Sequence, residues 1–214
     1  MNPFKCCILI CVLLVFTACT PIDTATPTPT PTEEGPLPKE LFIQRIMPML
    51  DAIARTIKGT EDEFSSQANL NITEGIIYSM LYTKNIPQDL AKQIDVSGTR
   101  VVVTYNALWK LYGRFFAYGK LPEIDENSIS EKLGGEKYAY EIINIDQYTV
   151  KNTINSATDN GYGQYTVMAS YNITDNITGD IVKSGRFTAR FKQVPGTHFG
   201  YGLQELKDIQ VLTD

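Results

Sequence analysis

The chain has 214 residues, of which 43% are hydrophobic and 20% are charged. This composition is typical of globular proteins and excludes collagen, coiled-coil and polytopic membrane proteins. The 19 Lys and Arg residues against 24 Asp and Glu residues give a net charge of −5. That balance argues against nucleic acid as a partner, because phosphate contacts need clustered cations.

The N-terminal segment is typical of an export signal. Lys5 precedes the almost wholly apolar run Cys6–Ala18, which is too short to span a membrane comfortably. The run ends in Phe-Thr-Ala-Cys at positions 16 to 19 and resembles the lipobox of bacterial lipoproteins, in which Leu usually stands where this chain has Phe16. An uncleaved anchor and an ordinary signal peptide with a chance Cys are the alternatives.

The lipobox resemblance implies a lipid anchor. Residues 1–18 would be removed as a signal peptide, and Cys19 would become the first residue and carry a diacylglyceryl thioether and a palmitate. Two acyl chains hold a protein on a membrane where one does not. The resemblance therefore implies a protein on the extracytoplasmic face of the cell membrane, anchored by lipid within the cell envelope.

Cysteine and histidine usage restricts the chemistry of the rest of the chain. The four cysteines all lie in the N-terminal segment, at Cys6, Cys7, Cys11 and Cys19. The remainder has no disulfide, thiol nucleophile or thiolate metal site. With His198 as the single histidine, a zinc site of His and Cys ligands is excluded. We predict no metal and no cofactor.

One segment partly matches a calcium loop. The run Asp175–Asp180 has Ile177 where an oxygen ligand belongs. A β-turn is predicted there instead.

Residues 19–38 are predicted to be the lipidated Cys and a linker. Thr and Pro alternate along Thr20–Pro38, a composition that favours polyproline II and cannot bury apolar surface. Its extended reach is on the order of 60 Å. The linker would hold residues 39–214 clear of the lipid headgroups.

The first half of that domain, residues 39–134, shows helical periodicity. Apolar residues three and four apart predict a helix over 39–58, with a kink at Pro48 and a stop at Gly59. A second helix is predicted over 73–84.

A third helix is predicted from Ser97 to Gly113, with Trp109 in the core, although the run Val101–Val103 fits a strand equally well. The sequence Ser128–Glu131 has the form of a capping box and predicts a short helix.

The second half, residues 135–214, switches to the period-2 pattern of strands. Strands are predicted over 138–150, 163–174, 181–193 and 199–211, with turns at Asn160-Gly161, Thr178–Asp180 and Pro195-Gly196. Alternation along the third strand places Ile181, Phe187, Ala189 and Phe191 on one face and Arg186, Thr188, Arg190 and Lys192 on the other.

Helices followed by antiparallel strands predict an α+β domain. The closing strands YTVMASYNIT, KSGRFTARFK and GYGLQELKDIQV resemble the C-terminal sheet of NTF2-like or cystatin-like extracytoplasmic domains, which occur on many bacterial lipoproteins. The resemblance implies N-terminal helices packed on a curved antiparallel sheet of about four strands. A separate helical subdomain is the alternative.

The sequence contains few of the residue patterns that enzymes use for catalysis. No Gly-x-Ser-x-Gly elbow is present, and His198 follows a turn, where a solvated loop residue is predicted. Glu141 and Asp146 would face opposite ways on one regular strand. We therefore predict a non-enzymatic protein. A hydrolase that acts on envelope glycans or peptides through two distant carboxylates is the alternative.

Binding is the predicted role, for an envelope protein or a wall glycan. Tyr165 and Tyr171 belong to a tyrosine-rich sheet half, and Arg186 and Arg190 lie on a basic strand face that suits an anionic polymer or lipid headgroups. These four are the candidate binding residues. Tyrosine as an ordinary strand residue and a merely solvated strand face are the alternatives. A purely structural role would instead require a large exposed apolar patch.

Overall fold

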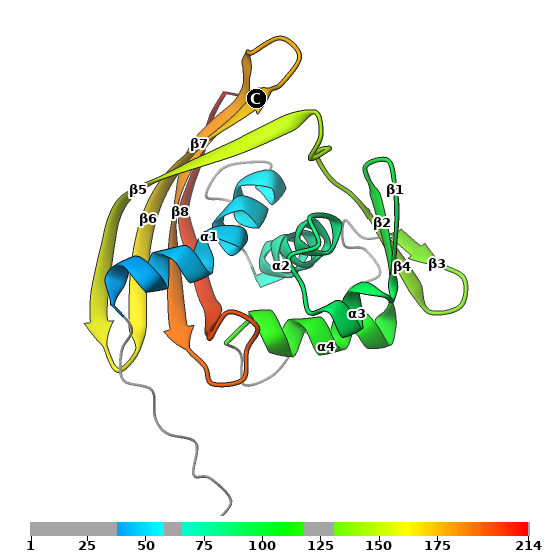
Figure 1. The fold of residues 1–214 in the computed structure, drawn as a ribbon, viewed down its shortest axis with the longest axis horizontal. Helices are drawn as coiled ribbons and strands as arrows, with labels where there is room; N and C mark the ends of the chain where they lie inside the picture. The colour runs from blue at the N-terminus through cyan, green and yellow to red at the C-terminus, as the bar shows by residue number, and fades with distance from the viewer. Residues whose placement is uncertain (1–37, 58–65, 118–130, 214) are drawn as a thin grey trace, which may run out of the picture. The chain divides into compact units, whose positions relative to one another are not determined.

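Helices predominate in the first half of the structure and long strands in the second (Figure 1). The computed structural model describes residues 38–57, 66–117 and 131–213. The predicted signal peptide, Cys19, nearly all of the linker and the predicted stop at Gly59 lie outside these residues. Within the described residues, no helix has the length and apolar character needed to cross a membrane.

The described residues form four helices and eight strands. The helices are α1 (Lys39–Thr56), α2 (Ser66–Tyr82), α3 (Gln88–Ala91) and α4 (Tyr105–Phe115). The strands are β1 (Ile94–Ser97), β2 (Arg100–Thr104), β3 (Glu131–Leu133), β4 (Lys137–Glu141), β5 (Tyr148–Gly161), β6 (Gln164–Asp175), β7 (Ile181–Gln193) and β8 (Tyr201–Thr213). They form two antiparallel four-stranded sheets, with strand orders β1-β2-β4-β3 and β5-β6-β7-β8.

The predictions of a mixed α/β protein with its helices in the N-terminal part and of a four-stranded antiparallel C-terminal sheet are confirmed, but the second sheet, β1-β2-β4-β3, was not expected. The strand expected over 138–150 is two strands, because the chain turns between Glu141 and Tyr148. Asn144 makes this turn: its Oδ1 accepts from the Asp146 N–H at 2.8 Å and its carbonyl from the Tyr148 N–H at 3.0 Å. Asn commonly closes such turns with its own side chain.

The helix predicted from Ser97 is wrong in its first part, and the alternative strand at Val101–Val103 is confirmed. These β-branched residues pair with β1 on one side and β4 on the other. Helix α4 begins only after Thr104, whose hydroxyl accepts from the Ala107 N–H at 3.3 Å as an N-cap. Glu131 likewise starts β3 rather than belonging to a short helix, while 128–130 lie outside the described residues.

Helix α1 follows its prediction and packs against β5 and β6 (Figure 1). Its apolar stripe is fully buried. The Phe42 ring stacks on Tyr165, with 4.1 Å between centroids, and meets Tyr201 edge-on at 4.8 Å. Such aromatic contacts stabilise beyond the apolar area they bury. They join the first helix to the C-terminal sheet.

A buried lysine terminates α1. Lys183 on β7 is 5% exposed, and its ammonium donates to the carbonyls of Ala54, at 3.3 Å, and Ile57. The last carbonyls of a helix lack intrahelical partners and form the negative end of its dipole, which favours a cation there. Lys183 therefore occupies the inner face of β7.

The predicted faces of β7 are largely correct. Phe187, Ala189 and Phe191 are buried at 0–1% exposure, but Ile181 is 50% exposed. The prediction that Ile181 lies on the same face as Phe187 is wrong, because the register between β6 and β7 shifts beside Ile181. A second irregularity in β5, between Ile154 and Ser156, moves the inward positions by one residue, as bulges do.

Candidate functional site

The structure places two of the four candidate binding residues in the core. Tyr165 is 3% exposed and Tyr171 is 1% exposed, so neither offers a surface to a partner. Burial also raises the pKa of the Tyr165 hydroxyl. Here the alternative interpretation, tyrosine as a strand residue that fills the core, describes these two side chains.

Other aromatic side chains also differ from expectation. Trp109 is only half-buried, and its indole N–H donates to the Tyr105 hydroxyl at 2.7 Å, so its predicted place in the core is wrong. Tyr162, at the tip of the β5–β6 hairpin, is 99% exposed. Tyr162 directly follows the turn predicted at Asn160-Gly161.

Arg186 and Arg190 both point away from the core, as their alternation predicts. We call the side of β5–β8 that carries them the outer face. Arg186 Nε donates to Gln210 Oε1 at 2.7 Å, and Arg190 forms an ion pair with Glu205. Both partners lie on β8 at the paired register positions. The two arginines are therefore held in place by the neighbouring strand.

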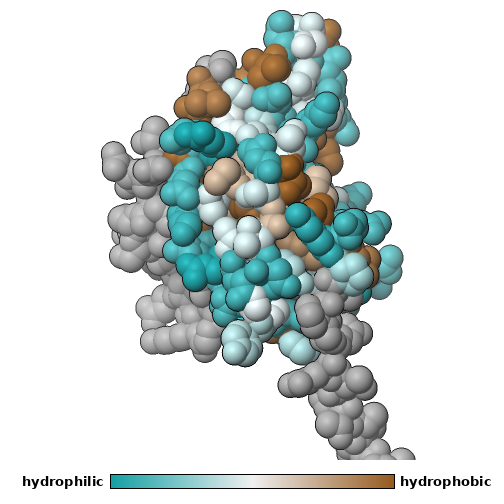
Figure 2. All heavy atoms as spheres, turned by 90° about the vertical axis from the view of Figure 1, so that its left-hand side faces the viewer, coloured by the Kyte–Doolittle hydropathy of each residue, from teal (hydrophilic) through white to brown (hydrophobic). Residues whose placement is uncertain are grey.

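Hydroxyl and amide side chains surround this basic row. On β6, Gln164, Thr166 and Ser170 pair with Lys192, Arg190 and Arg186, and the apolar Met168 lies among them opposite Thr188. Three further lysines belong to the outer face by strand register: Lys151, Lys192 and Lys207. Figure 2, which views the molecule from the side where β5 and β6 lie, shows hydrophilic residues predominating with smaller hydrophobic groups among them.

Exposed apolar side chains are found at one end of the C-terminal sheet. Ile177 is 81% exposed in the β6–β7 turn, and Ile181 and Leu212 are 50% and 69% exposed. Ile181 opens β7, and Leu212 lies where β8 pairs with that part of β7. Single exposed apolar residues are common on proteins, so these side chains do not by themselves indicate a structural scaffold.

A buried group of polar side chains lies where α1, α2, β5 and the connection from β4 to β5 meet. We call this group, formed by Asp51, Arg55, Tyr82, Asn144 and Asn152, the polar junction. Asn152 Nδ2 donates to Asp51 Oδ1 at 2.5 Å, and the Tyr82 hydroxyl donates to Asn144 Oδ1 at 3.1 Å. Four separate segments thus contribute polar groups, and Arg55 interacts electrostatically with both Asp51 and Tyr82.

Arg55 is the most buried charge of the junction. Its side chain is 7% exposed, and Nη2 donates to the Tyr148 carbonyl at 3.2 Å. Within the part of the chain that the structure describes, the Nε and Nη1 atoms have no hydrogen-bond partner, and neither does the buried Oδ1 of Asn152. Burial lowers the pKa of Arg55, an effect that the nearby Asp51 opposes. Burial likewise raises the pKa of Asp51, against the hydrogen bond from Asn152 and the charge of Arg55.

Sequence reasoning missed the polar junction. Asp51 and Arg55 are four residues apart, a spacing that puts them on neighbouring turns of one helix face. Asn152 stands at an inward position of β5, between Val150 and Ile154, where alternation favours an apolar residue. The polar residue at that position was the available signal.

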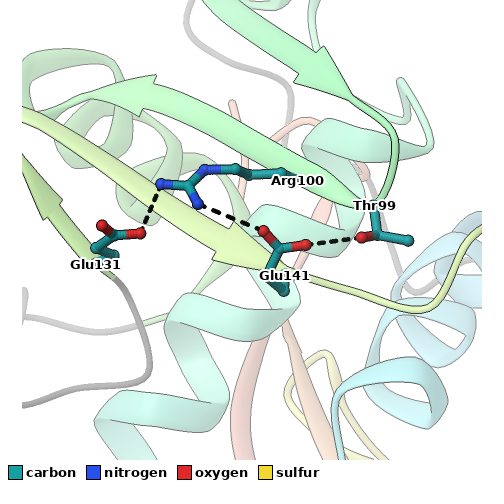
Figure 3. Close-up of polar contacts among 4 residues, drawn as sticks. All are labelled: Thr99, Arg100, Glu131 and Glu141. Atoms are coloured by element: carbon teal, nitrogen blue, oxygen red, sulfur yellow. Dashed lines mark hydrogen bonds and ion pairs between the residues drawn. The ribbon is translucent and has the colours of Figure 1, made fainter.

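Two carboxylates of the N-terminal sheet lie close to one arginine. Arg100 on β2 contacts Glu131 at 2.5 Å and Glu141 at 3.7 Å, and the Thr99 hydroxyl donates to Glu141 at 2.7 Å (Figure 3). The two carboxylates are 60% and 59% exposed. In this exposed setting Arg100 offsets their charge. Asp146, the other acid considered with Glu141, lies in the connection between β4 and β5.

Asp175, which was considered for metal binding, instead stabilises a turn. Asp175 Oδ1 accepts from the Ile177 N–H at 2.7 Å and the Thr178 N–H at 3.3 Å, which lowers its pKa and closes the predicted β-turn. These donors occupy oxygens that a calcium ion would need. Over the described ranges, no three His, Cys, Asp or Glu side chains are grouped so as to hold a metal.

His198 is an exposed loop residue, as predicted, with its ring 4.6 Å from that of Phe199. Partial burial and the charge of Arg114 lower its pKa.

Comparisons with protein-family models, with curated proteins and with solved structures found no match to this chain. The functional argument therefore depends on the chemistry of these side chains alone.

Proposed function

We propose that this protein is a lipid-anchored lipoprotein of the extracytoplasmic membrane face, whose folded part is a non-enzymatic binding module. The anchor is supported by the Phe-Thr-Ala-Cys sequence that ends in Cys19 and by the Thr/Pro alternation of residues 20–38. In this proposal the helices cover one side of a curved C-terminal sheet, as in NTF2-like or cystatin-like domains. The other side of the sheet remains available to a ligand.

The observation that carries the binding proposal is the basic outer face on an acidic chain. Arg186, Arg190 and Lys192 lie on the same face of β7, with Thr188 between the two arginines, whereas the whole chain has a net charge of −5. Glu205 offsets Arg190 only. Hydroxyl and amide groups beside these cations suit a hydrated, anionic glycan better than an apolar protein surface. The proposed ligand is therefore an anionic wall polymer.

Charge removal on the outer face tests this proposal. Full-length protein in detergent is incubated with purified anionic wall polymer, and bound protein is measured by sedimentation. Replacement of Arg186 and Lys192 by Gln is expected to weaken binding by about tenfold, equivalent to about 1.4 kcal/mol. Binding is also expected to fall with added salt, because exposed charges are screened.

The matched control removes two positive charges elsewhere. Lys84 and Lys110 lie outside the C-terminal sheet, and their replacement by Gln is expected to leave binding within a factor of about two. Equal losses in both double variants would show that only net charge matters. Unchanged binding in the first variant would refute the outer face as the binding surface and favour an envelope protein as the partner.

The anchor has its own test. Cys19→Ala removes the thiol that would receive the lipid, so the protein is expected to move from the membrane fraction to the soluble fraction and to lose palmitate labelling. A variant that stays fully in the membrane fraction would contradict the lipid anchor without bearing on the outer face.

A further inference from the structure

The polar junction contains two kinds of unsatisfied groups, on two side chains that both interact with Asp51. Among the described residues, Arg55 has donors at Nε and Nη1 without partners, and Asn152 has an acceptor at Oδ1 without one. Buried polar atoms in proteins are nearly always paired, and each exception calls for an explanation such as an ordered water or a ligand. Three such atoms belong to Asn152 and to Arg55, which is 7% exposed.

We propose that the polar junction binds a small zwitterion that carries a carboxylate and an ammonium on neighbouring atoms, as free α-amino acids do. The carboxylate would accept from the free donors of Arg55. The ammonium would donate to Asn152 Oδ1 and face the carboxylate of Asp51.

Charge balance favours a zwitterion over a simple anion. Arg55 and Asp51 lie four residues apart on α1 and interact electrostatically. A lone carboxylate would leave this partly buried site with an excess negative charge, which is costly away from water. A zwitterion adds one charge of each sign next to its opposite, so the site stays neutral.

The hydrogen-bonding chemistry agrees with this choice. A guanidinium presents planar N–H groups that match the two oxygens of a carboxylate. Arg55 uses only Nη2 for the protein, in its bond to the Tyr148 carbonyl, and that bond fixes the direction of the side chain. Asn152 is fixed in turn by its bond to Asp51, which orients its unused Oδ1. The site is therefore preorganised by contacts that do not involve the ligand.

The junction combines half-buried side chains with one buried side chain. Asp51, Asn144 and Asn152 are half-buried, whereas Arg55 is buried. A small ligand would enter past the half-buried residues and meet the arginine last. This site is separate from the outer face and does not depend on the proposed binding of a wall polymer.

Thermal unfolding of the full-length protein in detergent tests the proposal with three defined probes. Glycine carries both charges, glycolate only the carboxylate and ethanolamine only the ammonium. At a hundredfold excess over the Kd, glycine is expected to raise the Tm by about 5–10 °C, with little effect of the other two. Larger amino acids then report how much room the junction offers.

Two variants connect the effect to its residues. Arg55→Lys keeps the charge but removes the planar fork, and it is expected to abolish the glycine-dependent rise in Tm. Asp51→Asn is expected to reduce the rise and to remove the preference for glycine over glycolate. Arg100→Lys, an exposed arginine of the other sheet, is the matched control and should respond to glycine like the unmodified protein.

A measurement on the unmodified protein keeps the proposal falsifiable if Arg55 variants do not fold. Burial protects the Arg55 Nε–H from solvent exchange, so its NMR signal is expected to persist and to shift on titration with amino acids. No change in that signal and no rise in Tm, with amino acids on the order of 10 mM where a millimolar Kd would give near saturation, would overturn the proposal. Ordered water would then be the partner of Arg55. Equal stabilisation by glycolate would also overturn it, in favour of a simple anion site.

Discussion

The two sheets of this protein differ in how their strands are connected. In the C-terminal sheet, β5, β6, β7 and β8 are neighbours in both sequence and space. In the N-terminal sheet, β2 pairs with β4 although α4 and β3 lie between them in the chain. Pairing of sequence neighbours depends on local turns, whereas pairing across a helix depends on packing that is distributed over the core. The first is therefore much easier to predict from a sequence.

Particular residues show this contrast. Gly161, Gly179 and Gly196 have φ values of 79°, 79° and 84°. Gly161 ends β5 at its hairpin with β6, and the other two lie in the connections that follow β6 and β7, where the sequence predicted turns. Glycine adopts such angles without steric cost, so these turns could be recognised. Nothing comparable marks the pairing of Val101 with Tyr140. The valines fitted a helix and a strand equally well, and only the partner strand decided between them.

The largest expected effect tests whether the C-terminal sheet is as independent as its local connections suggest. Phe42 is fully buried between Tyr165 and Tyr201. Phe42→Ala is expected to lower the free energy of unfolding by about 3–5 kcal/mol, because it leaves a cavity at the contact of α1 with the sheet. Urea unfolding followed by circular dichroism measures the change.

The neighbouring Leu41 supplies the control for Phe42. It is 36% exposed, and Leu41→Ala is expected to change stability by about 0.5 kcal/mol or less. If Phe42→Ala costs about as little as Leu41→Ala, the C-terminal sheet holds its hairpins together without the helix, and α1 does not stabilise it.

The N-terminal sheet is expected to depend on close helix packing. A Cβ at Gly75 would lie 2.3 Å from Thr56 Cγ2 on α1 and 3.0 Å from the Tyr140 hydroxyl on β4. Gly75→Ala is therefore expected to destabilise by about 1–3 kcal/mol through overpacking. Gly113→Ala is the opposite case, since nothing lies within 4 Å of its Cβ position in α4.

Helix propensity alone acts at Gly113, and its replacement by Ala is expected to stabilise by about 0.5–1 kcal/mol. The same urea experiment measures both variants. Stabilisation by both would show that α2 can shift away from α1 and β4, so that the N-terminal sheet tolerates looser packing than the structure indicates.

The candidate sites show the same difference between local patterns, which could be predicted, and contacts between distant segments, which could not. Strand alternation correctly directed Arg186 and Arg190 outward, because a period of two fixes the face of each residue. It could not tell whether Tyr165 and Tyr171 met a ligand or a helix, since that depends on where α1 packs. The polar junction draws on segments that are distant in the chain, so its parts were visible in the sequence but their meeting was not.

A pH dependence is expected at the turn that joins β6 and β7. Backbone N–H donors lower the pKa of Asp175 below its usual value of 3.8. The carboxylate then contributes stability above about pH 5, and that contribution is lost as the pH falls through the folded pKa. Asp175→Asn is expected to lower the urea midpoint at pH 7, with a difference from the unmodified protein that shrinks toward about pH 2.

Asp180 in the same turn has an exposed side chain, and Asp180→Asn is the control with little expected change. A difference between Asp175→Asn and the unmodified protein that stays constant from pH 7 down to about pH 2 would assign the loss to hydrogen-bond geometry instead of charge.

The smallest expected effect concerns the ion pairs at the exposed side of the N-terminal sheet. Arg100 contacts Glu131 and Glu141, but its own side chain is 37% exposed and both carboxylates more so. Exposed pairs of this kind contribute at most about 1 kcal/mol. A double-mutant cycle with Arg100→Met and Glu131→Gln is therefore expected to give a coupling energy below about 1 kcal/mol, falling as salt is added. A larger, salt-resistant coupling would mean that surface charges hold β2, β3 and β4 together, and that the buried contacts around Gly75 contribute less than proposed. The charged residues of β2, β3 and β4 would then predict the pairing of these strands better than the buried residues do.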